Sequence, residues 1–347
     1  MRDTEGGYTL KVAALYAPYN FIIEERALPF LEPEWALVKV MAAGICGSDM
    51  HFYTGKLPLH KGAVRGHEIA GVVADPGDTS LPSGESVIIN PLVSCGSCQA
   101  CLRGDNHLCE DLQGIGGQYL GGFAEYVAVP KTNLYPYNSE LLSYECAALA
   151  DCVAVAMHAM NKVSLKAGEE VAIIGDGAIG LLLVQMAQVF QASKILLLGI
   201  HESNLKIGLA LGATAIATPA DYFSVTPSIS KFDVVFEAVG GASPPFKEGL
   251  TMLRKGGRLG VIGLSDTSKA EVPWLDVVFG EKVLIGIMGY GKQGNSDEMR
   301  DAITLMERGA ILLDPLISHR LSLYDIDKGF RMMLDKKHSQ TIKIVIH

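Results

Sequence analysis

Hydrophobic and polar positions divide the chain into a first part that favours strands and a later part in which strands and helices alternate. In the first part, short β-type runs are separated by prolines and polar loops, which is typical of strands joined by turns. We expect about the first 140 residues to be mostly β, with helical patterning from Ser143 onward. The runs span residues 11–15, 36–40, 69–74, 86–89 and 123–129.

From Glu170 onward, short apolar runs alternate with helical segments. Residues 171–174 form the first run, as expected for a strand buried on both faces of a parallel sheet. A glycine turn and a helical run over 181–191 follow it. This alternation predicts the α/β class with a doubly wound parallel sheet. Further strands are predicted at 194–198, 232–236 and 257–263, and a last one at 341–346, which we expect to return to the first domain.

Charge and cysteine content narrow the classes of function. The 347 residues include 29 Lys+Arg and 38 Asp+Glu, a net charge of −9, so the chain lacks the positive field that attracts nucleic acid or anionic lipid. Its polar, acidic start differs from a signal peptide. Seven cysteines, an odd number with four clustered, indicate metal ligation in a reducing compartment. We therefore expect a cytoplasmic protein that binds neither nucleic acid nor membrane.

Four of the cysteines lie in a segment of about residues 91–112, which we call the cysteine lobe. Their spacing, C-x2-C-x2-C-x7-C, lets the thiolates converge on one tetrahedral Zn²⁺. Because four thiolates leave no open coordination position, this zinc is expected to be structural. The same spacing is also compatible with an iron–sulfur cluster in place of zinc. A third alternative, a zinc ribbon that binds nucleic acid, is disfavoured by the acidic net charge of the chain. The four residues are Cys95, Cys98, Cys101 and Cys109.

A second set of metal-binding residue types lies in the segment 46–68. Cys46 and His67 offer a thiolate and an imidazole, both good ligands for Zn²⁺. Ser48 and His51 lie between them and are predicted to pass the proton of a substrate hydroxyl to water. This segment therefore predicts a catalytic zinc site.

Other residues of the same segment are expected to support the site or to lie outside it. Asp49 is predicted to contact one of the zinc-binding side chains and to orient it, without binding the metal itself. Four basic residues are expected to form a solvated loop, although a phosphorylated substrate would give them a role. They are Lys56, His60, Lys61 and Arg65.

The turn Gly175-x-Gly177-x-x-Gly180 follows a predicted strand and opens a predicted helix, which is the context of a dinucleotide-binding motif. Gly175 permits the tight turn, Gly177 lets the backbone approach a pyrophosphate, and Gly180 lets the helix pack on the strand. The phosphate is expected at the positive end of the helix, beside the intervening residues Ala178 and Ile179. The turn predicts a bound nicotinamide dinucleotide.

The end of the second strand of this unit normally carries an acid that binds the ribose 2′-hydroxyl of NAD. Here that position is Gly199, which removes the repulsion against the 2′-phosphate of NADP. His201 or Lys206 can neutralise that phosphate, so we favour NADP over NAD. NAD remains the alternative cofactor, because a shift of one helical turn would bring the carboxylate of Glu202 to the ribose.

Taken together, these motifs resemble the zinc-containing medium-chain alcohol dehydrogenases, and within them the polyol (sorbitol-type) branch. The resemblance spans almost the whole chain. It implies a β-rich GroES-like catalytic domain over residues 1–153 and 290–347, which includes the cysteine lobe, and a Rossmann coenzyme domain over 154–289. Beside the cysteine lobe and the glycine turn, the matching segments are 44–51, Gly66-His67-Glu68, 122–126, 236–240, Gly256-Gly257-Arg258 and 317–320.

The resemblance also implies a third protein ligand for the catalytic zinc, located before the glycine turn. Asp151 occupies the place where polyol-type relatives usually have Glu, and we favour it. Cys152 is a softer ligand but lies one residue late. Glu68, next to His67, can take the third place when substrate or water is bound.

We therefore predict a zinc-dependent oxidoreductase that transfers a hydride between a secondary alcohol and NADP or NAD. The resemblance favours a polyol, sugar or cyclitol as the small-molecule substrate, with one catalytic and one structural Zn²⁺ per chain. It also implies a homo-oligomer, either a tetramer or a dimer. The alternatives are a catalytically silent NAD(P)-binding protein of the same fold, and a dehydrogenase for an amino alcohol such as threonine.

Overall fold

The computed structural model describes residues 9–225, 232–266, 269–293 and 296–347, and it divides into two compact units. The first unit contains the described residues of Met1–Asp151, Gly291–Glu307 and Ile317–His347. The second contains those of Cys152–Tyr290 and Arg308–Leu316. Within the described ranges, no helix combines the length and apolar character that crossing a bilayer requires.

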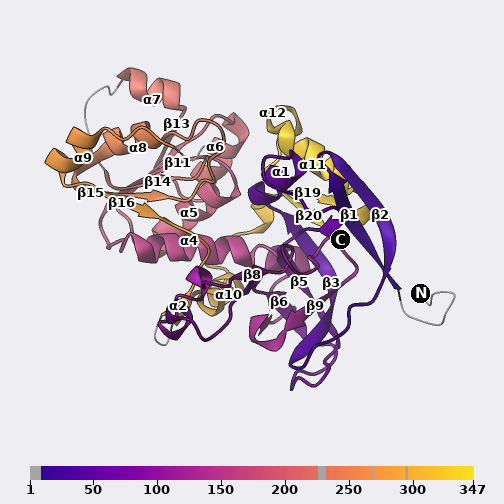
Figure 1. Cartoon of the computed structure of the whole chain (residues 1–347). Coiled ribbons are helices and arrows are strands. Elements are labelled where there is room, and N and C mark those ends of the chain that lie inside the picture. Colours follow the sequence, from indigo (N-terminus) through magenta and orange to yellow (C-terminus); the bar gives the residue numbers. More distant parts are fainter. Residues whose placement is uncertain (1–8, 226–231, 267–268, 294–295) are drawn as a thin grey trace. The chain divides into compact units, whose positions relative to one another are not determined.

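The first unit is built around strand β3 (Trp35–Ile45), which has partners along both edges. One edge pairs with β5 (Glu68–Asp75), and the other pairs with β9 (Tyr126–Pro130) and, near the end of β3, with β20 (Lys343–Ile346). The C-terminal strand, which the sequence predicted to return to the first domain, lies beside β3 in the first unit, and Figure 1 shows the two side by side. The end of β3 and the starts of β5 and β20 therefore meet at one place.

The remaining strands of the first unit complete this sheet or form smaller ones. They are β1 (Thr9–Ala17), β2 (Asn20–Ala27), β4 (Ala63–Val64), β6 (Ser86–Ile89), β7 (Leu92–Val93), β8 (Gln113–Gly114), β10 (Leu134–Pro136), β17 (Lys292–Gln293), β18 (Ser296–Asp297) and β19 (Ile317–Leu321). The helices are α1 (Gly47–Tyr53), α2 (Gln99–Leu102), α3 (Tyr144–Ala147), α10 (Glu298–Glu307), α11 (Ile326–Leu334) and α12 (Lys336–Ser339), and α4 (Ala150–Lys162) begins here.

The second unit is a six-stranded parallel sheet in the order β13-β12-β11-β14-β15-β16, with helices on both faces (Figure 1). This order reverses between β11 and β14, which is where dinucleotides bind in doubly wound sheets. The predicted α/β fold is thus confirmed. The strands are β11 (Glu170–Ile174), β12 (Lys194–Leu198), β13 (Ala215–Ala217), β14 (Phe232–Glu237), β15 (Leu253–Val261) and β16 (Val283–Gly286), and the helices are α5 (Ala178–Val189), α6 (Glu202–Ala210), α7 (Pro219–Val225), α8 (Phe246–Met252) and α9 (Trp274–Gly280).

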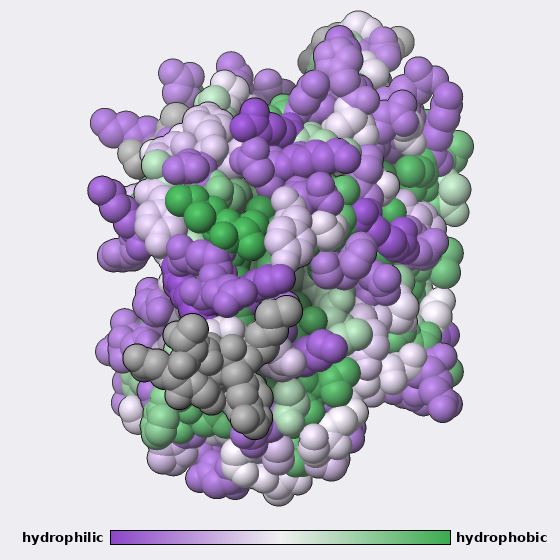
Figure 2. Space-filling model, turned by 90° about the vertical axis from the view of Figure 1, so that its right-hand side faces the viewer, coloured by the Kyte–Doolittle hydropathy of each residue, from purple (hydrophilic) through white to green (hydrophobic). Residues whose placement is uncertain are grey.

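The surface agrees with the composition. Figure 2 shows one face of the molecule, on which hydrophilic side chains predominate and hydrophobic ones form smaller separate groups. Scattered apolar side chains are normal on a protein surface.

Candidate active site

The cysteine lobe brings its four thiol groups together, as the sequence predicted. Their sulfur atoms lie within 4.8 Å of one another, and the Cys98–Cys101 and Cys95–Cys101 sulfur distances are 3.5 and 3.9 Å. Thiolates bound at about 2.3 Å to a tetrahedral Zn²⁺ stand about 3.8 Å apart. The lobe therefore has the dimensions of a four-thiolate zinc site.

Backbone groups of the lobe favour the ionised thiols that a metal needs. The backbone N–H groups of Ser97 and Cys98 lower the pKa of the Cys95 thiol to about 6. The backbone of Cys101 and Glu110 likewise lowers the pKa of Cys98. Burial and the neighbouring thiols, by contrast, raise the pKa of the Cys101 thiol to about 11. The positive charge of a bound Zn²⁺ would favour the thiolate of Cys101.

Cys46 lies between the end of β3 and a short helix, α1, that the sequence analysis did not predict. The backbone N–H of Cys46 donates to Oδ2 of Asp49 at 3.1 Å, which forms half of a capping box. Ser48 and His51 stand three residues apart on this helix, so they share one of its faces. A seven-residue helix gives too short a periodic pattern to be recognised, and only its cap signals it.

Cys46, His67 and Glu68 form a group whose possible ligand atoms lie within 4.8 Å of one another. Behind it, Oδ1 of the fully buried Asp49 lies 3.6 Å from Nδ1 of His67. A carboxylate beside one ring nitrogen orients an imidazole to bind a metal through the other. Burial disfavours the imidazolium of His67, but Asp49 and Cys46 outweigh it and raise the pKa of His67 well above its usual value. The donor set and its support fit a zinc ion.

Arg65 departs from the prediction of a solvated loop. Its side chain is only 12% exposed, and Nε lies 3.8 Å from the same Asp49 oxygen that faces His67. Its guanidinium carbon lies 3.7 Å from the centre of the Phe52 ring. Arg65 lies inward because β5 begins only three residues later and its pairing draws the preceding segment into the unit. The other three basic residues, Lys56, His60 and Lys61, are exposed as predicted.

Glu68 has a partner that sequence reasoning missed. Nζ of Lys343 lies 2.6 and 2.8 Å from the two carboxylate oxygens, and both side chains are buried. Gly44 makes room for this pair, because a Cβ there would overlap the Glu68 carboxylate. Lys343 is 275 residues away in sequence, and only the pairing of β20 with β3 brings it to the site.

The third-ligand candidates lie at the start of α4. Asp151 is half-buried, and one of its oxygens lies within 4.8 Å of a Glu68 oxygen, whereas the next residue, Cys152, is buried and belongs to the second unit. Among the described residues, the group that contains both Cys46 and His67 is completed by Glu68 rather than by Asp151. Of the two carboxylates considered as third ligand, Glu68 is thus the one grouped with Cys46 and His67.

The glycine turn in the second unit has the geometry expected of it. Gly175 adopts φ = +124°, and a Cβ on Gly180 would overlap the carbonyl oxygen of Gly175. Gly177 caps α5 and has no protein atom within 4 Å of where its Cβ would be. Packing therefore requires glycine at 175 and 180, whereas at 177 the open space suits a pyrophosphate. Ala178 and Ile179 form the first turn of α5.

The residues predicted to contact the ribose lie between β12 and α6. Gly199 directly follows β12, and His201 is the N-cap of α6. Lys206 is exposed and lies 2.7 Å from the Glu202 carboxylate, one turn earlier on the same helix. His201 therefore remains near the strand end, whereas the Lys206 ammonium is engaged on the outer face of α6.

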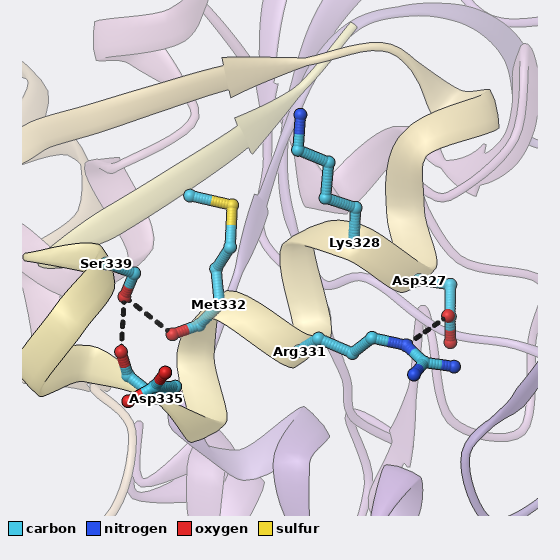
Figure 3. A pocket seen from close by; sticks show the side chains of 6 residues that line it. All are labelled: Asp327, Lys328, Arg331, Met332, Asp335 and Ser339. Atoms are coloured by element: carbon cyan, nitrogen blue, oxygen red, sulfur yellow. Dashed lines mark hydrogen bonds and ion pairs between the residues drawn. The ribbon is translucent and has the colours of Figure 1, made fainter.

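One surface pocket of the first unit lies away from the predicted site residues. Figure 3 shows it between α11 and α12, lined by Asp327, Arg331 and Ser339 among others. Nε of Arg331 donates to Asp327 at 2.7 Å, and the Ser339 hydroxyl donates to two backbone carbonyls. These three side chains already have hydrogen-bond partners within the first unit, and no predicted metal ligand lines the pocket. We therefore assign the pocket no role.

Comparison with known proteins places this geometry in a family. Residues 32–139 match the alcohol dehydrogenase GroES-like domain, and residues 178–308 match the zinc-binding dehydrogenase domain. The chain is 31% identical to L-threonine 3-dehydrogenase of Bacillus velezensis, over 91% of this chain and 92% of that protein. It is 30% identical to sorbitol dehydrogenase of Bacillus subtilis, over 97% of each.

A solved structure gives the same result. A zinc-binding dehydrogenase from Sinorhizobium meliloti, determined with NADP bound, superposes with a TM-score of 0.88 at 30% identity, over 98% of this chain and 99% of that chain. The likeness covers both units, the cysteine lobe and the glycine turn. The chain belongs to the zinc-containing medium-chain alcohol dehydrogenase family.

Proposed function

We propose that this protein oxidises a secondary alcohol of the polyol, sugar or cyclitol type and reduces NADP or NAD, with NADP preferred. The observation that carries the proposal is the difference between its two donor groups. The cysteine lobe offers four thiols, whereas Cys46, His67 and Glu68 form a mixed group with a carboxylate held behind the imidazole. A three-ligand mixed site with a position left for substrate is typical of catalytic zinc.

The chain's own residues would hold the metal and move the proton. Cys46 and His67 would bind the ion, with Asp151 or Glu68 as the third ligand. Bound Zn²⁺ would supply Lewis acidity to the substrate hydroxyl, and bound NAD(P) would accept the hydride. Ser48 would take the hydroxyl proton and His51, on the same face of α1, would pass it to water.

Each unit has a proposed role. Residues 1–153 and 290–347 would form the catalytic domain, with the lobe at about 91–112. Residues 154–289 would form the coenzyme domain, where Gly175, Gly177, Ala178, Ile179 and Gly180 would hold the pyrophosphate. The division of the structure at Asp151 and Tyr290 is close to these limits, although Arg308–Leu316 belongs to the second unit.

The relatives support two substrate classes. One is named for sorbitol, a polyol, and another for L-threonine, an amino alcohol with a secondary hydroxyl. Both have a polar group on the carbon next to the one that is oxidised. We favour the polyol class, and a threonine-type amino alcohol is the second candidate.

The test follows nicotinamide absorbance with NADP and NAD separately, across polyols, cyclitols, simple secondary alcohols and L-threonine. We expect reduction with the polyol or cyclitol class in protein that contains two zinc ions per chain. Reduction with threonine alone would select the second candidate. Absence of reduction by every substrate, in protein with both zinc ions, would favour a catalytically silent nucleotide-binding protein instead.

We also propose that the chain is cytoplasmic and forms a homo-oligomer. The seven cysteines, all free, suit a reducing compartment. Among the strands that the structure describes, β16 is the last of the parallel sheet and pairs only with β15, and exposed apolar side chains gather on it and on α9, including Trp274, Phe279 and Val283. An open edge beside an apolar helix face is suited to pairing with a second copy. Light scattering of Phe279→Glu should show a smaller assembly than the parent protein.

A further inference from the structure

The space beside Gly199 is filled by a carboxylate from another segment. A Cβ on Gly199 would lie 2.5 Å from Cγ of Asp176, so a side chain at 199 would displace Asp176. Asp176 is the residue between the first two glycines of the turn and is 6% exposed. The Asp176 carboxylate therefore occupies the space that a side chain at the end of β12 would need.

Both oxygens of Asp176 face one residue, His201. Oδ2 accepts the backbone N–H of His201 at 2.6 Å, and Nδ1 of the imidazole lies 3.0 Å from Oδ1. The buried Asn204 donates to the backbone carbonyl of Asp176 at 3.0 Å, which ties the turn to α6. The imidazole is the more exposed partner, with 21% of its side chain accessible against 8% for Asp176. A ligand at the strand end would therefore meet His201 before it meets the carboxylate.

This arrangement changes what the strand end recognises. A strand-end acid binds the 2′-hydroxyl of NAD and repels a 2′-phosphate. Here Asp176 holds Nδ1 of His201, which leaves Nε2 for a ligand, and a protonated imidazole makes charge-assisted hydrogen bonds to phosphate. The residue between Gly199 and His201 is the uncharged Ile200, which is 75% exposed.

We propose that Asp176 is a positioning residue that fixes His201 as the receptor for the 2′-phosphate of NADP. The proposal rests on the proposed function, because it assumes that the glycine turn binds a dinucleotide. The residue proposed to determine cofactor specificity thus lies inside the glycine turn. The usual determinant, the acid at the end of the second strand, would instead be expected at position 199 or just after it.

The experiment measures binding of two nucleotide fragments to the full chain by calorimetry. Adenosine 2′,5′-bisphosphate carries the 2′-phosphate, and adenosine 5′-monophosphate lacks it. The quantity of interest is the ratio of their affinities, because a general disturbance of the fold would weaken both fragments alike. We expect the unmodified protein to bind the bisphosphate more tightly.

Two substitutions of His201 separate its two nitrogens. His201→Asn keeps an amide nitrogen near the position of Nδ1 but has no group at Nε2, and should lower the affinity ratio about tenfold. His201→Gln places an amide nitrogen near Nε2 and should retain more of the ratio. Lys166→Gln, which removes a positive charge from an exposed position of the second unit, is the control for overall charge and should leave the ratio unchanged.

Asp176→Asn tests the positioning role itself. We expect it to lower the affinity ratio, since the imidazole loses its charged partner. A rise in the ratio would show that Asp176 repels the 2′-phosphate as a strand-end acid does, and would overturn the proposal. An unchanged ratio in both Asp176→Asn and His201→Asn would overturn it and leave the proposed function standing, whereas failure of the unmodified chain to bind either fragment would overturn both.

Discussion

The cysteine lobe and the Cys46 site are both groups of metal-binding side chains in the first unit, but they are assembled in different ways. The lobe takes all its donors from Cys95 to Cys109, and the turns of that one segment converge them. The Cys46 site takes its donors from the end of β3 and the start of β5, and its support comes from α1 and β20.

The two groups also differ in what surrounds them. The lobe is partly exposed, and short sulfur–sulfur contacts dominate it. The Cys46 site rests on buried charges: Asp49 behind His67, Arg65 beside Asp49, and Lys343 on Glu68. Buried charges are costly unless they are paired, so they are found where an active site requires their electrostatic effect. The comparison shows that a closed site needs only local geometry, whereas an open site needs a supporting shell.

Removing one cysteine from each site should separate catalysis from stability. Cys46→Ser should lower turnover by more than about a thousandfold, because the metal's Lewis acidity is worth several kcal/mol of transition-state stabilisation. The zinc content, measured by mass spectrometry, should fall from two to one per chain with little change in melting temperature. Unchanged turnover would disprove the assignment of Cys46.

The matched variant, Cys98→Ser, should also lose one zinc, but it should lose stability and keep its turnover. Calorimetry should show a loss of stability of several kcal/mol, because structural zinc binding is coupled to folding. Turnover per folded chain should remain. If folded Cys98→Ser protein with one zinc were inactive, the lobe would be the catalytic site.

The Lys343–Glu68 pair should be the most sensitive part of the supporting shell. Lys343→Met should lower the free energy of unfolding by about 3 to 5 kcal/mol, because it leaves a buried carboxylate without its counter-charge. The double variant Lys343→Met with Glu68→Gln should recover much of that loss, since neither buried charge remains. Urea denaturation of both variants measures the difference, and equal stability of the two would exclude charge burial as the cause.

Asp49→Asn should have a smaller effect that is confined to the open site. Loss of the carboxylate beside His67 should weaken zinc binding there by about 10- to 100-fold. Competition with a chelator, read separately for the two zinc ions, should show no change in the lobe. An equal effect on both sites would mean that the substitution acts through the fold as a whole.

The sequence predicted what depends on short spacing. The four cysteines, the glycine turn and the alternation after Glu170 are local patterns, and the structure confirmed the lobe's geometry and the parallel sheet. Helix α1 was missed because seven residues give no clear period. Arg65 was placed in a solvated loop because its polar neighbours lie in one, although the adjacent strand draws it inward.

By itself, the sequence determined the residue types available for chemistry, the family resemblance and the two-part organisation of the chain. The tertiary structure decided which side chains share a site. Pairing of β3 with β5 and β20 brings Lys343 onto Glu68, and the bend of the glycine turn places Asp176 in the space that Gly199 leaves. Both contacts join residues that are far apart in sequence and have no common local pattern, because they form only after the strands that carry or precede those residues have paired.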